Sequence, residues 1–199
     1  MAMRVVINNG PGRKRTAASG RALKAAKPQI VLRAAVADDA PALLELIAAH
    51  LEEGRLLPRS LDELKVHAPR FVVAVEQRSD GDRIVGCAEL APLSQAVAEI
   101  RSLVVSSSAR QLGIGNRMVE ALASRARNEE FARLCAFAHD PAFFVRRGFS
   151  IVPHTWVPEK IAHDCITCPL FRNCGQFAIV LELDRMNAAG SVRRTANVN

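Results

Sequence analysis

The stretch from residue 98 to residue 122, AEIRSLVVSSSARQLGIGNRMVEAL, constrains the fold of this chain more than any other segment. An apolar run is followed by a short polar turn, by two glycines in R-x-x-G-x-G spacing and by an amphipathic helical pattern. Gly113 and Gly115 allow backbone angles that other residues avoid, and the first N–H groups of a helix have no intrahelical acceptor. This order predicts a strand, a loop and a helix N-terminus that together bind an anion such as a phosphate.

Two better-known phosphate-binding loops do not match these residues. A Walker loop needs Gly-Lys followed by Ser or Thr, whereas Asn116 and Arg117 follow Gly115 here. A dinucleotide fingerprint needs three glycines after a first strand and an acid about twenty residues further on. This loop has two glycines and lies past the middle of the chain. Neither class of loop therefore fits.

Strand-like and helix-like segments alternate along the chain. Apolar and β-branched runs predict strands at 29–33, 71–76, 84–90, 98–105, 133–138, 149–152 and 178–183. Helical spacing predicts helices after Asp38 or Asp39, over 60–67, over 115–128 and over 141–147. The 71–105 region is expected to run antiparallel, and the glycine loop to start a parallel crossover. The sequence therefore predicts an α/β (α+β) fold, with a mixed, mostly antiparallel sheet flanked by helices.

The glycine loop resembles the acyl-coenzyme A pyrophosphate loop of the GNAT N-acetyltransferases. The resemblance narrows to the N-acetylglutamate synthase type of amino-acid acetyltransferase through LLPRS at 56–60, GCAEL at 86–90, AEIRSLVV at 98–105 and FFVRRGF at 143–149. It covers residues 30–184. It implies transfer of the acetyl group of acetyl-coenzyme A to the α-amino group of an amino acid. The expected product is N-acetyl-L-glutamate, for arginine biosynthesis. The chain has no room for a kinase-like regulatory domain, so the short stand-alone type is expected.

The resemblance also implies where acetyl-coenzyme A binds. Main-chain groups of Val104 and Val105 are implied to pair with the pantetheine arm, in a gap where two central parallel strands separate. By residue type alone, both valines fit an ordinary core equally well. The implied pyrophosphate site comprises Arg110, Gln111, Leu112, Gly113, Ile114, Gly115 and Asn116.

Acetyl transfer requires a proton acceptor, because an α-amino group is mostly protonated at neutral pH. Glu99 is the candidate base, since it is one of few acids in a strongly apolar strand and shares a strand face with Arg101. The alternative for Glu99 is an exposed or salt-bridged glutamate. His139 is a candidate proton donor to the leaving thiolate, and its alternative role is a helix cap. The chain contains no Tyr that could serve as this donor.

An acidic amino acid brings carboxylates, which arginine binds in bidentate geometry. The resemblance implies that Arg59 and the adjacent Ser60 contact the substrate, with Arg101 and Ser102 as further candidates. By residue type alone, Arg59 is equally a surface charge at a helix start. Ser102 stands where synthases of this type often carry a basic residue. Another amino acid, a polyamine, an antibiotic and a protein N-terminus therefore stay open as acceptors.

A second unusual segment, HDCITCPLFRNC, spans residues 163–174. His163, Cys165, Cys168 and Cys174 have the residue types of a zinc site or, with an external ligand, of an iron–sulfur site. Buried thiols or a reversible redox pair are the alternatives. A non-enzymatic metal- or redox-responsive protein with a GNAT-like fold is the alternative from another class. Cys87 and Cys135 lie in strand patterns and are expected in the core.

Positive charge concentrates at the start of the chain. Residues 1–28 carry seven Lys and Arg and no acid, which accounts for the formal net charge of +7. We predict a disordered basic arm at 1–28, one domain at 29–184 and a disordered tail at 185–199. Without interleaved aromatics in the arm, nucleic acid is not an expected partner. No apolar run reaches membrane-spanning length, so a soluble, cytoplasmic protein with small-molecule partners is expected. Homo-oligomerisation stays open.

Overall fold

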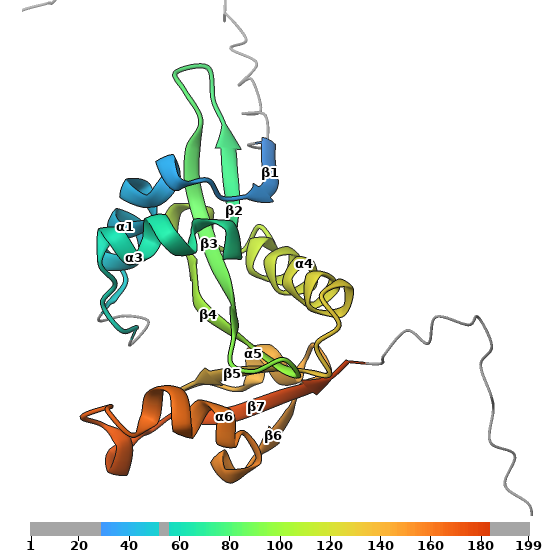
Figure 1. Cartoon of the computed structure of the whole chain (residues 1–199). Coiled ribbons are helices and arrows are strands. Elements are labelled where there is room, and N and C mark those ends of the chain that lie inside the picture. Colours follow the sequence, from blue (N-terminus) through green and yellow to red (C-terminus); the bar gives the residue numbers. More distant parts are fainter. Residues whose placement is uncertain (1–28, 52–55, 184–199) are drawn as a thin grey trace, which may run out of the picture.

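The structure is a computed structural model that describes residues 29–51 and 56–183. Within these residues, seven strands form one sheet in the order β1-β2-β3-β4-β5-β7-β6 (Figure 1). The β4–β5 pair is parallel and the other pairs are antiparallel. The strands span Gln29–Ala34 (β1), Phe71–Gln77 (β2), Arg83–Pro92 (β3), Val97–Val105 (β4), Arg133–Ala138 (β5), Ser150–Val152 (β6) and Phe177–Glu182 (β7). The predicted mixed, mostly antiparallel sheet is confirmed.

The helices span Ala40–Ala48 (α1), Leu61–His67 (α3), Ile114–Asn128 (α4), Ala142–Val145 (α5) and Pro158–Lys160 (α6). Four of the described α-helices, α1, α3, α4 and α5, lie where the hydrophobic spacing predicts a helix, whereas α6 was not predicted. A π-helical turn, Ile161–Cys165, continues α6. Ser60 caps α3, because its Oγ accepts a hydrogen bond of 3.2 Å from the N–H of Glu63. Among the described residues, no helix combines the length and the hydropathy that a membrane crossing needs. The predicted arm and tail lie outside the described residues.

Helices cover the sheet on both faces. One face packs against α4, where Met118 and Leu122 contact the core side chains of β3 and β4. Two separate groups of side chains pack on the other face. The first group comes from α1 and α3 and packs against β2 and β3. The second group includes Val157, directly before α6, which packs against Val97 of β4 and Cys135 of β5. Because side chains alternate along a strand, Glu99 and Arg101 lie on the same face as Val97, between these two groups.

The two central parallel strands separate in the middle of the molecule. In the described part of the chain, β4 pairs with β5 only from Val97, opposite Arg133, to Ile100, opposite Ala136. β4 nevertheless continues to Val105. A register shift against β3 and a left-handed φ of 48° at Ser102 mark a bulge just beyond the last pair. The gap implied by the resemblance is therefore present in the fold.

Candidate active site

The glycine loop forms a turn at the N-terminus of α4. Gly113 is the N-cap residue with φ 73°, and Gln111 has φ 65°. Ile114 is buried and anchors the start of the helix in the core. Left-handed turns of this kind expose successive backbone N–H groups, and the helix start adds N–H groups without intrahelical acceptors. The predicted loop therefore has the backbone of an anion site, with Leu112 and Asn116 exposed beside it.

Gly115 makes a close contact behind this loop. A Cβ on Gly115 would lie 3.4 Å from the ring of Phe143, in ordinary van der Waals contact, so the ring lies close against the helix start. Val104 is buried against the α1 and α3 side. Arg110 reaches back to β4, and its Nε donates to the carbonyl of Val105 at 3.3 Å. A contact of Val104 or Val105 with pantetheine stays a prediction.

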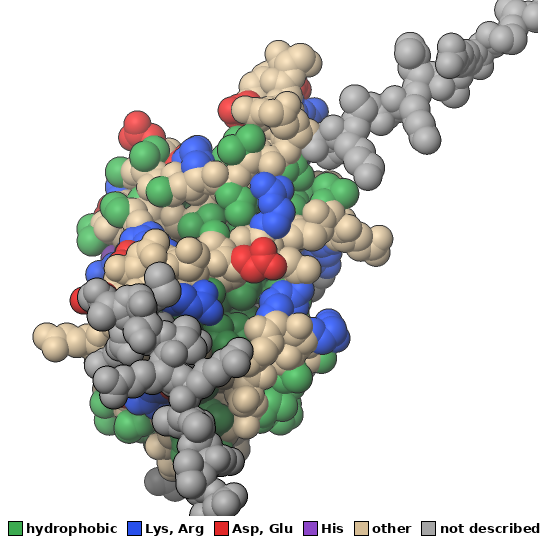
Figure 2. Space-filling view, turned by 90° about the vertical axis from the view of Figure 1, so that its right-hand side faces the viewer, with side chains coloured by type: hydrophobic (Ala, Val, Ile, Leu, Met, Phe, Trp, Pro, Cys, Tyr) green, Lys and Arg blue, Asp and Glu red, His purple; other side chains and the backbone are tan. Residues whose placement is uncertain are grey.

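The side of the molecule that carries α4 has charged side chains of both signs. Figure 2 shows Lys and Arg side chains on this face beside acidic and hydrophobic ones. Arg117 lies in the first turn of α4 and is exposed, whereas Arg125 in the last turn pairs with Glu129 at 2.6 Å. The cation that α4 places close to the glycine loop along the chain is therefore Arg117.

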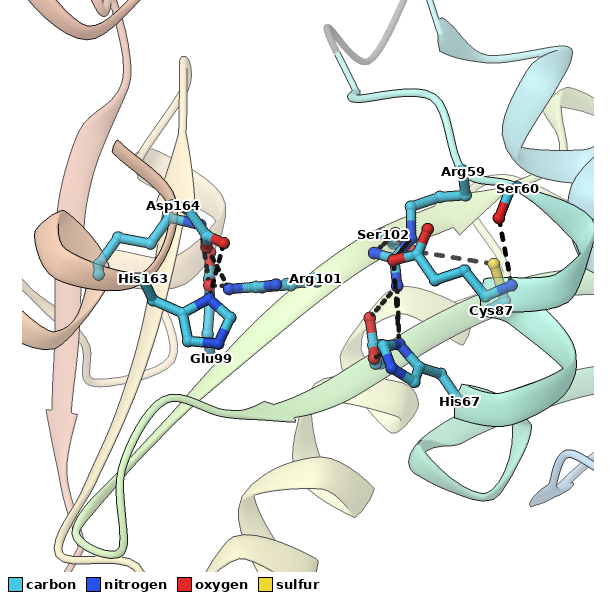
Figure 3. A network of polar contacts seen from close by, with 12 residues as sticks. Arg59, Ser60, His67, Cys87, Glu99, Arg101, Ser102, His163 and Asp164 are labelled. Atoms are coloured by element: carbon cyan, nitrogen blue, oxygen red, sulfur yellow. Dashed lines mark hydrogen bonds and ion pairs between the residues drawn. The ribbon is translucent and has the colours of Figure 1, made fainter. Parts of the chain in front are cut away.

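Glu99 lies one residue before the last β4–β5 pair and is the centre of a charged network (Figure 3). Its Oε2 accepts a hydrogen bond from Arg101 Nε at 2.6 Å. Lys160 Nζ lies 2.7 Å from Glu99 Oε1 and 2.9 Å from Oε2. Lys160 also donates to Asp164 Oδ2 at 2.8 Å, and Asp164 accepts from Arg101. These four side chains close a circle of alternating charge, which we call the Glu99 ring.

Asp164 and Arg101 stabilise each other's charged forms within the Glu99 ring. Burial raises the pKa of Asp164, but hydrogen bonds from Lys160 and His163 lower it further, so it stays below its usual value. Burial lowers the pKa of Arg101, but Glu99 and Asp164 raise it more, so it lies above its usual value. The ring consists of two acidic and two basic side chains, so its formal charges sum to zero.

A second charged group, the Arg59 cluster, lies beside the ring on the same face of the sheet (Figure 3). Arg59 Nη2 is 2.7 Å from Glu89 Oε2, and Arg59 Nε is 2.9 Å from Glu63 Oε1. Arg59 Nη1 donates to Ser102 Oγ at 3.4 Å. His67 Nδ1 lies 3.2 Å from Glu89 Oε1. Arg59, a predicted substrate ligand, is therefore paired with two carboxylates in this structure.

Several of these residues were not identified from the sequence. Glu89 is 1% exposed and lies opposite Arg101 in the β3–β4 register, so it connects the Arg59 cluster with the Glu99 ring. An acid within an apolar strand is the signal that selected Glu99, and it would equally have selected Glu89. Lys160 and Asp164 come from α6 and the π-helical turn, which no strand or helix pattern placed near β4.

Two predicted site residues make other contacts. Ser60 caps α3 with its hydroxyl. His139 Nδ1 lies 3.0 Å from the carbonyl oxygen of Gly175, and this contact is separate from the Glu99 ring. A substrate role for Ser60 and a proton-donor role for His139 stay predictions.

The cysteine segment does not form the predicted metal site. The described residues include no group of three or more His, Cys, Asp or Glu side chains placed to hold a metal ion. His163 pairs with Asp164 at 2.9 Å. The zinc or iron–sulfur prediction for His163, Cys165, Cys168 and Cys174 is therefore not confirmed, and all three of these cysteines are free thiols.

The two remaining cysteines lie in the core, as predicted. Cys87 and Cys135 are completely buried within β3 and β5. Burial raises the pKa of the Cys87 thiol to about 12, and it raises the pKa of Cys135 as well. Both thiols are therefore protonated and unreactive at neutral pH.

A left-handed turn at a helix start, beside two separating parallel strands, is the arrangement expected of an acyl-coenzyme A-dependent transferase. The chain matches the acetyltransferase (GNAT) family over residues 40–149. It is 30% identical over 145 residues to an uncharacterized N-acetyltransferase of Chlorobaculum tepidum, covering 73% of this chain and 91% of that protein. The chain therefore belongs to the GNAT acetyltransferase family, and it is an acyltransferase.

Two further comparisons extend the match. The chain is 30% identical over 131 residues to the amino-acid acetyltransferase of Mycobacterium tuberculosis, covering 66% of this chain and 74% of that protein. Its fold is similar to N-acetylglutamate synthase from Neisseria gonorrhoeae complexed with coenzyme A and N-acetyl-glutamate. The TM-score is 0.68 at 27% identity, covering 80% of this chain and 36% of that chain. The suspected amino-acid acetyltransferase type is supported.

Proposed function

We propose that this protein transfers the acetyl group of acetyl-coenzyme A to the α-amino group of L-glutamate, and that it serves arginine biosynthesis in the cytoplasm. The observation that carries the proposal is the position of Glu99. Glu99 lies one residue before the last pair of β4 with β5, and its carboxylate accepts a hydrogen bond from Arg101. A proton acceptor is therefore held at the entrance of the gap in which the thioester is expected.

The glycine loop supports acetyl-coenzyme A as the co-substrate. Gln111 and Gly113 adopt the left-handed angles of an anion-binding turn, directly at the start of α4. The N. gonorrhoeae synthase, which has a similar fold, was solved with coenzyme A. In this proposal the loop binds the pyrophosphate, and Val104 and Val105 line the pantetheine arm along the unpaired end of β4.

The chemistry follows from these positions. The acceptor ammonium gives a proton to Glu99, and the freed nitrogen attacks the carbonyl carbon of the thioester. A C–N bond forms and the C–S bond breaks. The nitrogen gives its second proton to solvent, the coenzyme A thiolate takes up a proton from solvent or from His139, and Glu99 returns its proton to solvent, so that one proton is released in all. The remaining contribution of the site is to hold the amine and the thioester within reacting distance.

L-Glutamate is the proposed acceptor because of the relatives and of Arg59. The M. tuberculosis relative is named an amino-acid acetyltransferase, and the N. gonorrhoeae structure contains N-acetyl-glutamate. Arg59 Nη1 lies 3.4 Å from Ser102 Oγ, at the bulge where β4 leaves β5. In this proposal the side-chain carboxylate of the bound L-glutamate competes there with Glu63 for the Arg59 guanidinium. This competition is the step on which glutamate selectivity rests.

Thiol release from acetyl-coenzyme A tests the proposal, with the twenty amino acids and spermidine as acceptors and mass spectrometry of the products. We expect saturable turnover with L-glutamate, and a loss of about 100-fold or more in Glu99→Gln. Glu182→Gln, which changes an exposed glutamate at the end of β7, is the matched control and should keep full activity. The rate of thiol release by His139→Gln tests whether the imidazole supplies the proton to the thiolate. An unchanged rate would remove His139 from the mechanism.

Each outcome has a distinct meaning. Turnover of another amino acid in place of L-glutamate would discard the acceptor and the pathway. Equal activity of Glu99→Gln and the wild type would remove Glu99 from the mechanism. No turnover with any free amino acid would overturn the proposed activity.

A further inference from the structure

The Glu99 ring has the charge pattern of a free amino acid already built into it. Lys160 presents an ammonium to Glu99 at 2.7 and 2.9 Å. Asp164 presents a carboxylate to Arg101. Lys160 and Asp164 lie one helical turn apart on the same short segment, and their side chains pair with each other at 2.8 Å. The segment therefore offers β4 one cation and one anion side by side, as the head group of an α-amino acid does.

From this match, and resting on the proposed function, we propose that Lys160 and Asp164 select acceptors with a zwitterionic head group. The acceptor ammonium takes the place of Lys160 at Glu99. The acceptor α-carboxylate takes the place of Asp164 at Arg101, and Lys160 turns to the same carboxylate. The acceptor class is thus a free α-amino acid, rather than an amine without a neighbouring carboxylate.

Charge balance in a poorly hydrated site is the physical basis of this selection. The side chains of Glu99 and Lys160 are only 4% and 14% exposed. A buried charge that loses its partner is strongly destabilised. A zwitterion leaves the net charge of the ring at zero. Its ammonium pairs with Glu99, its carboxylate pairs with Arg101 and Lys160, and the displaced Asp164 keeps its contact with His163 at 2.9 Å. A polyamine or a protein N-terminus brings a cation alone and leaves one positive charge uncompensated.

Arg101 and Asp164 form the more exposed side of the Glu99 ring, where an acceptor can replace an internal partner. The side chains of Arg101 and Asp164 are 20% and 27% exposed, so the ring is reached from the Asp164 side. Asp164 lies in a π-helical turn, a geometry that occurs mostly in short pieces and often at functional sites. The titratable groups that face or influence Glu99 are Arg101 on β4, Cys135 on β5, Lys160 on α6 and Asp164 on the π-helical turn.

Two isomeric acceptors test the inference on the unmodified protein. Isoglutamine is L-glutamate with its α-carboxylate converted to an amide, whereas L-glutamine has the amide on the side chain. We expect kcat/KM for isoglutamine to fall about 100-fold or more below that for L-glutamate, because a site built for a group rejects an analogue that lacks it. L-Glutamine keeps its zwitterionic head group. Its kcat/KM should therefore fall less below that of L-glutamate than the kcat/KM of isoglutamine does.

Substitutions in the ring give effects of opposite sign. Asp164→Asn removes the internal competitor of the α-carboxylate, so KM for L-glutamate should fall about threefold or more while kcat changes little. Lys160→Met removes a partner of that carboxylate, so KM should rise about tenfold. Lys160→Arg keeps the positive charge, so its KM should stay close to the wild-type value. Lys65→Met and Asp80→Asn, at exposed positions on α3 and in the β2–β3 turn, are the matched controls.

Thermal unfolding of each variant separates a change in the site from a loss of the fold. An isoglutamine kcat/KM equal to that of L-glutamate overturns the inference and leaves the proposed function intact. A raised KM in a folded Asp164→Asn variant also overturns it, because a merely structural role predicts that sign. If another α-amino acid is the acceptor, the same comparison applies to it and its α-amide. Absence of turnover with every free amino acid overturns both proposals.

Discussion

At the residue scale, two buried glutamates on neighbouring strands have different partners. Glu99 accepts hydrogen bonds from Arg101 and Lys160 on its two oxygens. Glu89 pairs with Arg59, whose side chain is 9% exposed. A buried ion pair contributes little net stability, but removing one of its partners leaves a charge that neither water nor protein compensates. Glu89 therefore fixes the position of Arg59.

The Glu89–Arg59 pair leads to a stability prediction. We expect Glu89→Gln to lower the free energy of unfolding by about 3 kcal/mol, because buried Arg59 then keeps only the more exposed Glu63 as a charged partner. The double variant Glu89→Gln with Arg59→Met should lose less than the sum of the single changes. Urea unfolding measures both, with the exposed Glu182→Gln as control. Additive losses would contradict a coupled buried pair.

At the element scale, the loop before α4 combines a strained backbone with a close contact. Gly113 lies at φ 73°, an angle that costs other residues about 1–2 kcal/mol. Gly115 lies against Phe143, which in turn contacts Phe144 of α5 edge to face. The loop is therefore held by α4 on one side and by α5 on the other. Its N–H groups are fixed before a ligand arrives.

Substitution of the loop glycine tests this pre-organisation. Gly113→Ala should lower the free energy of unfolding by about 1 kcal/mol and weaken coenzyme A binding, measured by calorimetry. Gly81→Ala is the matched control, because Gly81 also has a positive φ, of 120°, but lies in the β2–β3 turn. It should cost stability and leave coenzyme A affinity unchanged. Equal coenzyme A affinity in both variants would argue against the loop as the pyrophosphate site.

At the scale of the whole molecule, the net positive charge lies in residues 1–28 and the described domain begins after them. Residues 1–28 carry the seven excess positive charges, and the remainder holds 20 Lys and Arg against 20 Asp and Glu. The described domain contains its own sheet, with helices on both faces. The basic arm is therefore expected to contribute charge and not core.

Deletion of residues 1–28 tests this division. We expect the truncated protein to keep its unfolding midpoint, its coenzyme A affinity and its turnover, because the described core begins at β1. Its retention on a cation-exchange resin should fall, since the net charge drops to about zero. A pull-down with RNA before and after the deletion identifies any nucleic-acid binding by the arm. A large loss of stability would show that the arm belongs to the domain.

The sequence alone determined the elements and the loop, because both depend on local chemistry. Hydrophobic period, the Ser60 cap and the glycine spacing act over a few residues, and the strands, α3 and the start of α4 lie where these signals predict them. The acid in an apolar strand, together with the resemblance, selected Glu99 as the candidate base, and this role stays a prediction.

Only the tertiary structure decided which charges meet. Lys160 and Asp164 are 61 and 63 positions from their partners Glu99 and Arg101, and Arg59 is 30 positions from Glu89. Nothing in the local pattern of either segment encodes such a pairing. It arises because two separate groups of helices cover one face of the sheet and leave the middle of β4 between them. Burial there makes an unpaired charge costly, so the charges that the fold brings together must compensate one another.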